Sequence, residues 1–162
     1  MVEMKVQGLF FDSETNQSIV VLKDEASGRT LPIWVGLFEA NAITMGIENT
    51  WTPRPMTHDL IKNIIDGVKA VVKKITVSDL RSNTFYAAIS LEIEGKPIEI
   101  DSRPSDAIAL ALRVKAPIYV AEKVLDSVSQ PEPKDKDKKD VSGKWIDDLF
   151  DKLKPEDFKS EM

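Results

Sequence analysis

The sequence predicts an α+β fold in which two copies of a strand-strand-strand-helix unit flank one additional amphipathic helix. Two observations predict it. Strand-like runs separated by turn residues precede an apolar helical segment twice, and residues 31–47 align with residues 96–112 without a gap. The aligned identities are Pro32 with Pro97, Ile33 with Ile98, Ala42 with Ala107, and Ile43 with Ile108. The expected strands, in antiparallel or mixed sheets, are 4–11, 18–23, 30–35, 74–80, 84–93 and 97–100.

Each predicted unit ends in a helix whose composition indicates burial. Residues 37–48 carry few charges, and the segment after the polar turn at 101–106 is almost entirely apolar up to Pro117. A short strand is expected at 118–121. Between the units, apolar residues at helical spacing predict an amphipathic helix over Thr57–Val72, with Thr57 as its N-cap. The apolar set is Leu60, Ile61, Ile64, Ile65, Val68, Val71 and Val72.

The chain divides into one domain and a tail. We expect the domain over residues 1–126, a charged flexible linker over 127–140, and a short amphipathic helical tail over 141–162. A stripe of large apolar side chains predicts that the tail helix docks on this domain, on a second subunit or on another protein. The stripe consists of Trp145, Ile146, Leu149, Phe150 and Leu153.

Composition excludes several kinds of site. There is no cysteine, so disulfides, thiolate metal sites and a cysteine nucleophile are absent from the chain. No apolar run approaches the roughly 20 residues of a membrane helix, and charges interrupt the N-terminus, so we expect a cytoplasmic protein without a membrane partner. The net charge of −5 disfavours nonspecific nucleic-acid binding, which needs a basic surface, but permits a local basic patch.

The polar turn at 101–106 supports two interpretations. Its helix start beside Arg103 suits an anion such as phosphate, because unpaired backbone N–H groups and a guanidinium face the same place. Alternatively, Ser102 or Ser105 caps the helix, and Pro104 occupies its first turn. The corresponding turn of the first unit has Gly36, Leu37 and Phe38 where the second has Asp101, Ser102 and Arg103, with Glu39 as its one acidic residue. The sequence therefore favours the second unit as the functional one.

A second Arg-Pro pair, at Arg54, also opens a helix. If the two helix starts meet, His58, Asp59, Asp101 and Asp106 would form one catalytic cluster. Asp59, Asp101 and Asp106 would then hold Mg²⁺ or Mn²⁺, which carboxylates prefer. The expected phosphate-binding residues are Arg54, Arg103 and Ser105. A buried salt-bridge network between two helix ends is the alternative. No phosphate loop or dinucleotide fingerprint is present, so we expect no organic cofactor.

Four motifs occur in order along the chain, at residues 31–40, 54–60, 83–87 and 101–108. Together they resemble the bifunctional nuclease domain family over about residues 3–126. The resemblance implies an α+β fold that assembles into homo-oligomers, and a nuclease activity on RNA and DNA like that described for plant members. It assigns no catalytic residues, so the roles given above rest on side-chain chemistry.

Two functional hypotheses follow from the sequence. In the first, the chain is a metal-dependent nuclease that hydrolyses phosphodiester bonds of RNA or DNA, with His58 as general base or acid and Arg54 and Arg103 on the phosphate. In the second, the chain is a non-enzymatic binding or assembly module, and the same polar cluster is structural. Cleavage of labelled single-stranded RNA by highly purified protein discriminates between them.

Overall fold

The computed structural model describes residues 1–128, which form a mixed seven-stranded sheet and four helices. The sheet order is β3-β2-β1-β7-β4-β5-β6, so the last of the seven strands within residues 1–128 lies at the centre. The predicted α+β class is therefore confirmed. The strands are β1 (Val2–Asp12), β2 (Gln17–Lys23), β3 (Thr30–Val35), β4 (Val71–Arg81), β5 (Thr84–Ile93), β6 (Lys96–Ser102) and β7 (Ile118–Val120). The helices are α1 (Leu37–Glu48), α2 (Thr57–Gly67), α3 (Pro104–Val114) and α4 (Glu122–Ser127).

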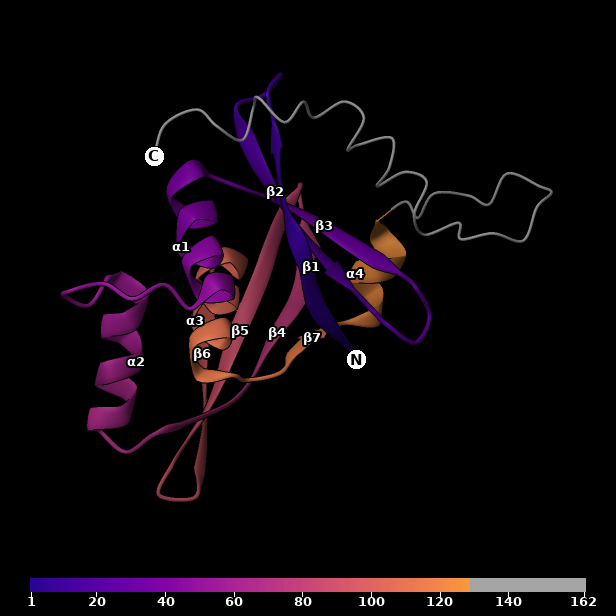
Figure 1. The fold of residues 1–162 in the computed structure, drawn as a ribbon. Helices are drawn as coiled ribbons and strands as arrows, with labels where there is room; N and C mark the ends of the chain where they lie inside the picture. Colours follow the sequence, from indigo (N-terminus) through magenta and orange to yellow (C-terminus); the bar gives the residue numbers. More distant parts are fainter. Residues whose placement is uncertain (129–162) are drawn as a thin grey trace.

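Two antiparallel meanders make up most of the sheet. β1, β2 and β3 form the first and lead into α1, and β4, β5 and β6 form the second and lead into α3. β7 joins them, antiparallel to β1 and parallel to β4 (Figure 1). In the ungapped alignment, Gly36 corresponds to Asp101. The N-cap of α1 is Gly36, but that of α3 is Arg103, so the two helices do not begin at aligned positions. A duplication of one ancestral unit stays a prediction.

Helix α3 lies at the centre of the core, and α1 and α2 pack beside it on one side of the sheet (Figure 1). Residues 107–111 are at most 1% exposed, which explains why this segment is almost free of polar residues. Gly46 of α1 allows a close approach, since a Cβ there would meet Leu112 and the Arg113 guanidinium of α3. Helix α3, which begins at the polar turn, is therefore packed closely on both the core and α1.

Helix α2 is shorter than the sequence predicts. It ends at Gly67, and Lys69 adopts a left-handed conformation that stops the helical path. Val71 and Val72 then belong to β4 and pair with Glu92 and Leu91 of β5. The predicted helix to Val72 was wrong because these β-branched residues fit the sheet, and a periodic apolar pattern does not separate a helix from a following strand. The N-cap is Met56 and not Thr57.

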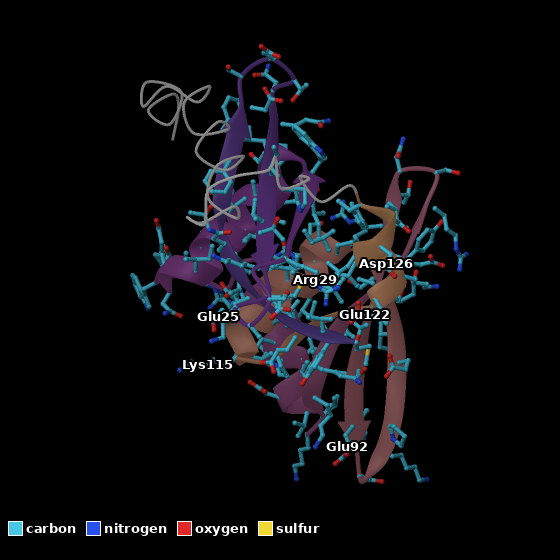
Figure 2. All side chains as sticks on the ribbon, turned by 90° about the vertical axis from the view of Figure 1, so that its right-hand side faces the viewer. Glu25, Arg29, Glu92, Lys115, Glu122 and Asp126 are labelled. Atoms are coloured by element: carbon cyan, nitrogen blue, oxygen red, sulfur yellow. The ribbon has the colours of Figure 1, made fainter. Side chains whose placement is uncertain are left out.

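Helix α4 is a further element that the sequence did not predict. It closes the domain through buried Val124 and Leu125, and an ion pair of 2.9 Å joins Glu122 to Arg29 in the turn between β2 and β3 (Figure 2). The predicted linker begins at residue 127, where α4 ends. The linker after Val128 and the predicted tail over 141–162 lie outside the described residues. In residues 1–128, no helix is long and apolar enough to cross a membrane.

Candidate functional site

The starts of α2 and α3 meet, as the paired Arg-Pro turns predict. The Nε2 atom of His58 lies 2.9 Å from Oδ1 of Asp106, across 48 positions of sequence. His58 is only 8% exposed although it lies in the first turn of α2, because α3 packs against it. We call this pair the His58–Asp106 dyad.

Arg103 joins the dyad to the first unit of the fold. Its Nε donates to Oδ2 of Asp106 at 2.8 Å, and its Nη1 donates to Glu39 of α1 at 3.1 Å. Gly36 leaves room for this arrangement, since a Cβ at that position would collide with the Glu39 carboxylate. Helix α1 therefore contributes a charged group to the cluster, although the sequence favoured the second unit as the functional one.

Asp59 forms a second, separate polar contact beside the dyad. Its Oδ2 accepts the Met56 backbone N–H at 3.0 Å, and its Oδ1 accepts Nε of Arg113 at 2.9 Å. The Arg113 side chain is 8% exposed, and its Nη1 also donates to the carbonyls of Ala42 and Ala109. Arg113 therefore ties α1, α2 and α3 together. A single arginine at the end of an apolar helix gave no signal in the sequence for this role.

The electrostatics of the site favour ionised carboxylates. Burial alone would raise the pKa of Asp106, but the hydrogen bonds from Arg103 and His58 outweigh it and hold that pKa below its ordinary value. Asp59 behaves similarly: burial opposes ionisation, while the Met56 N–H and Arg113 lower its pKa below the usual range. The hydrogen bond to Asp106 and its negative charge raise the pKa of Arg103.

These shifts predict a loss of stability in acid. Because the pKa of Asp106 and that of Asp59 are lower in the folded state, their stabilisation is complete above about pH 4 and is lost as pH falls through the folded values. Chemical denaturation at pH 7, 4 and 3 should show Asp106→Asn less stable than wild type at pH 7, with the difference shrinking towards pH 3. Asp66→Asn, at an exposed ion pair on α2, is the matched control. A constant difference would contradict the expectation.

Two crevices meet at Arg103 and Glu39. The first, of about 330 Å³, is lined by the dyad together with Phe38, Met56 and Arg113, and we call it the dyad crevice. The second, of about 420 Å³, lies between the end of β3, the turn joining β4 to β5, and the start of α3, and we call it the Trp34 pocket. Ser105 lines the Trp34 pocket. The four sequence motifs thus converge on one region, although they are spread over the chain.

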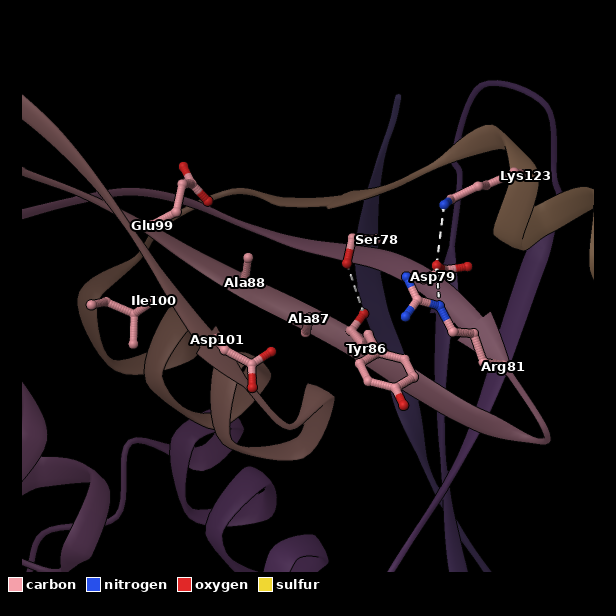
Figure 3. A pocket seen from close by; sticks show the side chains of 10 residues that line it. All are labelled: Ser78, Asp79, Arg81, Tyr86, Ala87, Ala88, Glu99, Ile100, Asp101 and Lys123. Carbon is pink, nitrogen blue, oxygen red and sulfur yellow. Dashed lines mark hydrogen bonds and ion pairs between the residues drawn. The ribbon is translucent and has the colours of Figure 1, made fainter.

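Asp101 lies apart from the dyad. It belongs to β6, which continues to Ser102, so the predicted turn residue follows the alternation of a strand. Its neighbour Ser102 pairs with Ala87, which is buried in the core, whereas Asp101 lies in another pocket with Tyr86 and Asp79 (Figure 3). Arg54 is exposed on the loop before α2 and lines neither the dyad crevice nor the Trp34 pocket. The structure therefore gathers only part of the predicted cluster.

The dyad has the geometry of an oriented base. A carboxylate that accepts Nε2–H of an imidazole fixes its tautomer, leaves Nδ1 as the proton acceptor, and stabilises the imidazolium formed when Nδ1 takes a proton. Arg103, beside the same carboxylate, presents a guanidinium suited to a phosphate oxygen. The arrangement can thus combine proton transfer with binding of an anionic group.

The sequence of this chain matches one protein family and is similar to several individual proteins. A family model described as the bifunctional nuclease domain matches residues 20–133. An uncharacterized protein of Mycobacterium tuberculosis is 35% identical, with 99% of each chain covered. Bifunctional nuclease 1 of Oryza sativa subsp. indica is 27% identical over 75% of this chain and 39% of its own length. Bifunctional nuclease 1 of Arabidopsis thaliana is 29% identical over 67% of this chain and 34% of its own length. This chain thus spans little more than a third of the plant relatives.

Proposed function

The chain belongs to the bifunctional nuclease domain family, and from that premise we propose that it hydrolyses phosphodiester bonds in RNA, DNA or both. The observation that carries the proposal is the His58–Asp106 dyad at 2.9 Å, set beside Arg103 in a crevice. A cytoplasmic location is part of the same proposal, and a chain without cysteine is compatible with the reducing conditions there.

We assign a role to each member of this cluster. Nδ1 of His58 accepts the proton of the attacking hydroxyl or water, while Asp106 holds the Nε2–H and stabilises the imidazolium. As the new P–O bond forms, the P–O bond to the leaving oxygen breaks; that oxygen takes a proton from water, and the imidazolium returns its proton to solvent. Arg103 keeps its contact with Asp106 and exchanges Glu39 for a phosphate oxygen, so that it neutralises charge developing on the phosphate. Ser105 lines the adjoining wall.

The predicted Mg²⁺ or Mn²⁺ site does not fit the three carboxylates named from the sequence. Both oxygens of Asp59 and of Asp106 accept hydrogen bonds, and Asp101 lies in another pocket. Within residues 1–128, no group of three or more histidine or acidic side chains is placed to hold a metal. We therefore derive no catalytic step through a metal at these residues, and metal dependence stays a prediction.

A cleavage assay tests the proposed function. Purified protein is incubated with labelled 20-nucleotide RNA and DNA, with Mg²⁺, with Mn²⁺ and with a chelator. We expect fragments from at least one substrate, and the chelator arm decides whether a metal is required. Intact substrates in every arm would favour the alternative of a binding or assembly module.

One observation favours self-association alongside this function. Leu60 and Ile64 on α2 and Val68 at its C-cap follow each other at intervals of four and are each more than half exposed, whereas Ile61 and Ile65 pack on the core. An exposed apolar stripe of this kind suits a protein interface. We propose that α2 contributes to a homo-oligomer in which two copies bury these stripes.

Replacing Ile64 by lysine tests this assembly. A charge in an apolar interface is costly to bury, so the variant should shift to a smaller species in light scattering at micromolar concentration. Asn63→Lys, at a neighbouring exposed position, is the matched control and should keep the wild-type mass. A monomeric wild type, or an Ile64→Lys variant of unchanged mass, would contradict the proposal.

A further inference from the structure

The Trp34 pocket has an aromatic wall that the catalytic roles above do not use. Trp34 is 49% exposed on β3, an edge strand, because its neighbours Ile33 and Val35 point into the core and strand alternation turns the indole outward. Leaving half of an indole in water forgoes much of the stabilisation that its burial would give. A half-exposed flat ring that lines a pocket is a surface on which a base can stack.

The pocket also carries polar groups suited to a nucleotide. Asn83, at the turn between β4 and β5, presents an amide with donors and an acceptor, which suits the edge of a base. Arg103 also lines this pocket and is shared with the dyad crevice. The volume of about 420 Å³ falls in the range of sites for small organic groups, roughly 300–1,000 Å³.

The charge distribution favours an unpaired strand over a duplex. Proteins that bind duplexes depend on a broad basic surface, and this chain has a net charge of −5. Within residues 1–128, Arg103 is the one basic side chain that lines the Trp34 pocket, so the pocket can hold a single phosphate but offers no broad basic surface to a duplex. Stacking needs no basic surface, but a base can reach an aromatic ring only when it is not paired within a duplex.

Resting on the proposed nuclease function, we propose that the Trp34 pocket is the specificity subsite for single-stranded nucleic acid. An unpaired base of RNA or DNA stacks on the Trp34 indole, and Asn83 contacts the edge of that base. The neighbouring phosphate then lies at Arg103, next to the dyad. The ring selects for strandedness and tolerates any base, because every base has a face that can stack.

Binding measured without cleavage tests this inference. The full-length chain carries His58→Gln in every sample, and fluorescence anisotropy follows labelled 12-nucleotide RNA and DNA, each alone and annealed to its complement. Trp34→Ala should weaken binding of the single strands about fivefold or more, and Trp34→Phe, which keeps a ring, should weaken it less. The control is Trp51→Ala, since Trp51 is 81% exposed but lines neither crevice, and its affinity should stay unchanged. RNA and DNA are scored separately.

The outcomes separate this inference from the proposed function. Trp34-dependent binding of single strands would uphold the subsite. If the wild-type protein nevertheless cleaved no substrate, the proposed nuclease function would be overturned. Equal affinity of the Trp34→Ala variant and its parent, or tighter binding of duplexes, would overturn the subsite even where wild type cleaves. A fall in oligomeric mass in Trp34→Ala without a change in affinity would make this surface a contact between copies and would likewise overturn the subsite.

Discussion

Replacing Arg113 by alanine should destabilise the domain by about 3 kcal/mol, the largest effect on stability that we expect from a single polar side chain. Arg113 is almost fully buried and donates to Asp59 and to the carbonyls of Ala42 and Ala109. Its removal leaves these acceptors without their donor between packed helices. Urea denaturation at pH 7 measures the change in the free energy of unfolding.

Two further variants show whether the effect comes from this network. Arg113→Lys keeps the charge but loses the planar fork, so it should fall between wild type and alanine. Arg81→Ala removes an arginine whose side chain is 67% exposed, and its effect should be within about 0.5 kcal/mol. Equal, small effects at both positions would mean that Arg113 does not hold the three helices together.

Replacing Asp106 by asparagine should lower the cleavage rate by roughly 100-fold or more, since asparagine neither stabilises an imidazolium nor fixes the same tautomer of His58. The His58→Gln change should cost about as much, and the double variant little more, because the two residues act as one unit. Single-turnover rates measure these effects. Additive losses would contradict a dyad.

Asp101→Asn separates the expectation drawn from sequence from the one drawn from structure. The sequence grouped Asp101 with His58, and the structure places it in another pocket, so we expect a rate within a few fold of wild type. A loss comparable to that of Asp106→Asn would restore the catalytic role that the sequence predicted. Thermal melts of both variants check that each remains folded.

The fold was largely predictable from the sequence because its signals are local. Alternating runs with turn residues between them gave the six strands of the meanders, and an all-apolar segment gave the buried helix α3. The boundary at Gly67 was missed because apolar residues continue from α2 into β4. Helix α4 has only six residues, too few for a periodic pattern.

The site was predictable only in part, because it depends on contacts between distant segments. The repeated Arg-Pro turns were enough to predict that His58 lies near Asp106. Asp101 was misplaced because β6 runs on to Ser102, and one residue decides which face of a sheet a side chain takes. Glu39 joins the cluster through the packing of α1 on α3, and Arg113 joins it through the packing of α3 on α1 and α2, which no local pattern encodes.

Cleavage that follows the protein through purification tests the central claim most directly. Wild type and His58→Gln are purified in parallel, and each size-exclusion fraction is assayed on the same labelled single-stranded RNA and DNA. If the dyad performs phosphodiester hydrolysis, activity should rise and fall with the wild-type protein peak and should be at least 100-fold lower across the His58→Gln peak. Activity that elutes elsewhere, or that is equal in the two preparations, would come from a contaminant and would contradict the account.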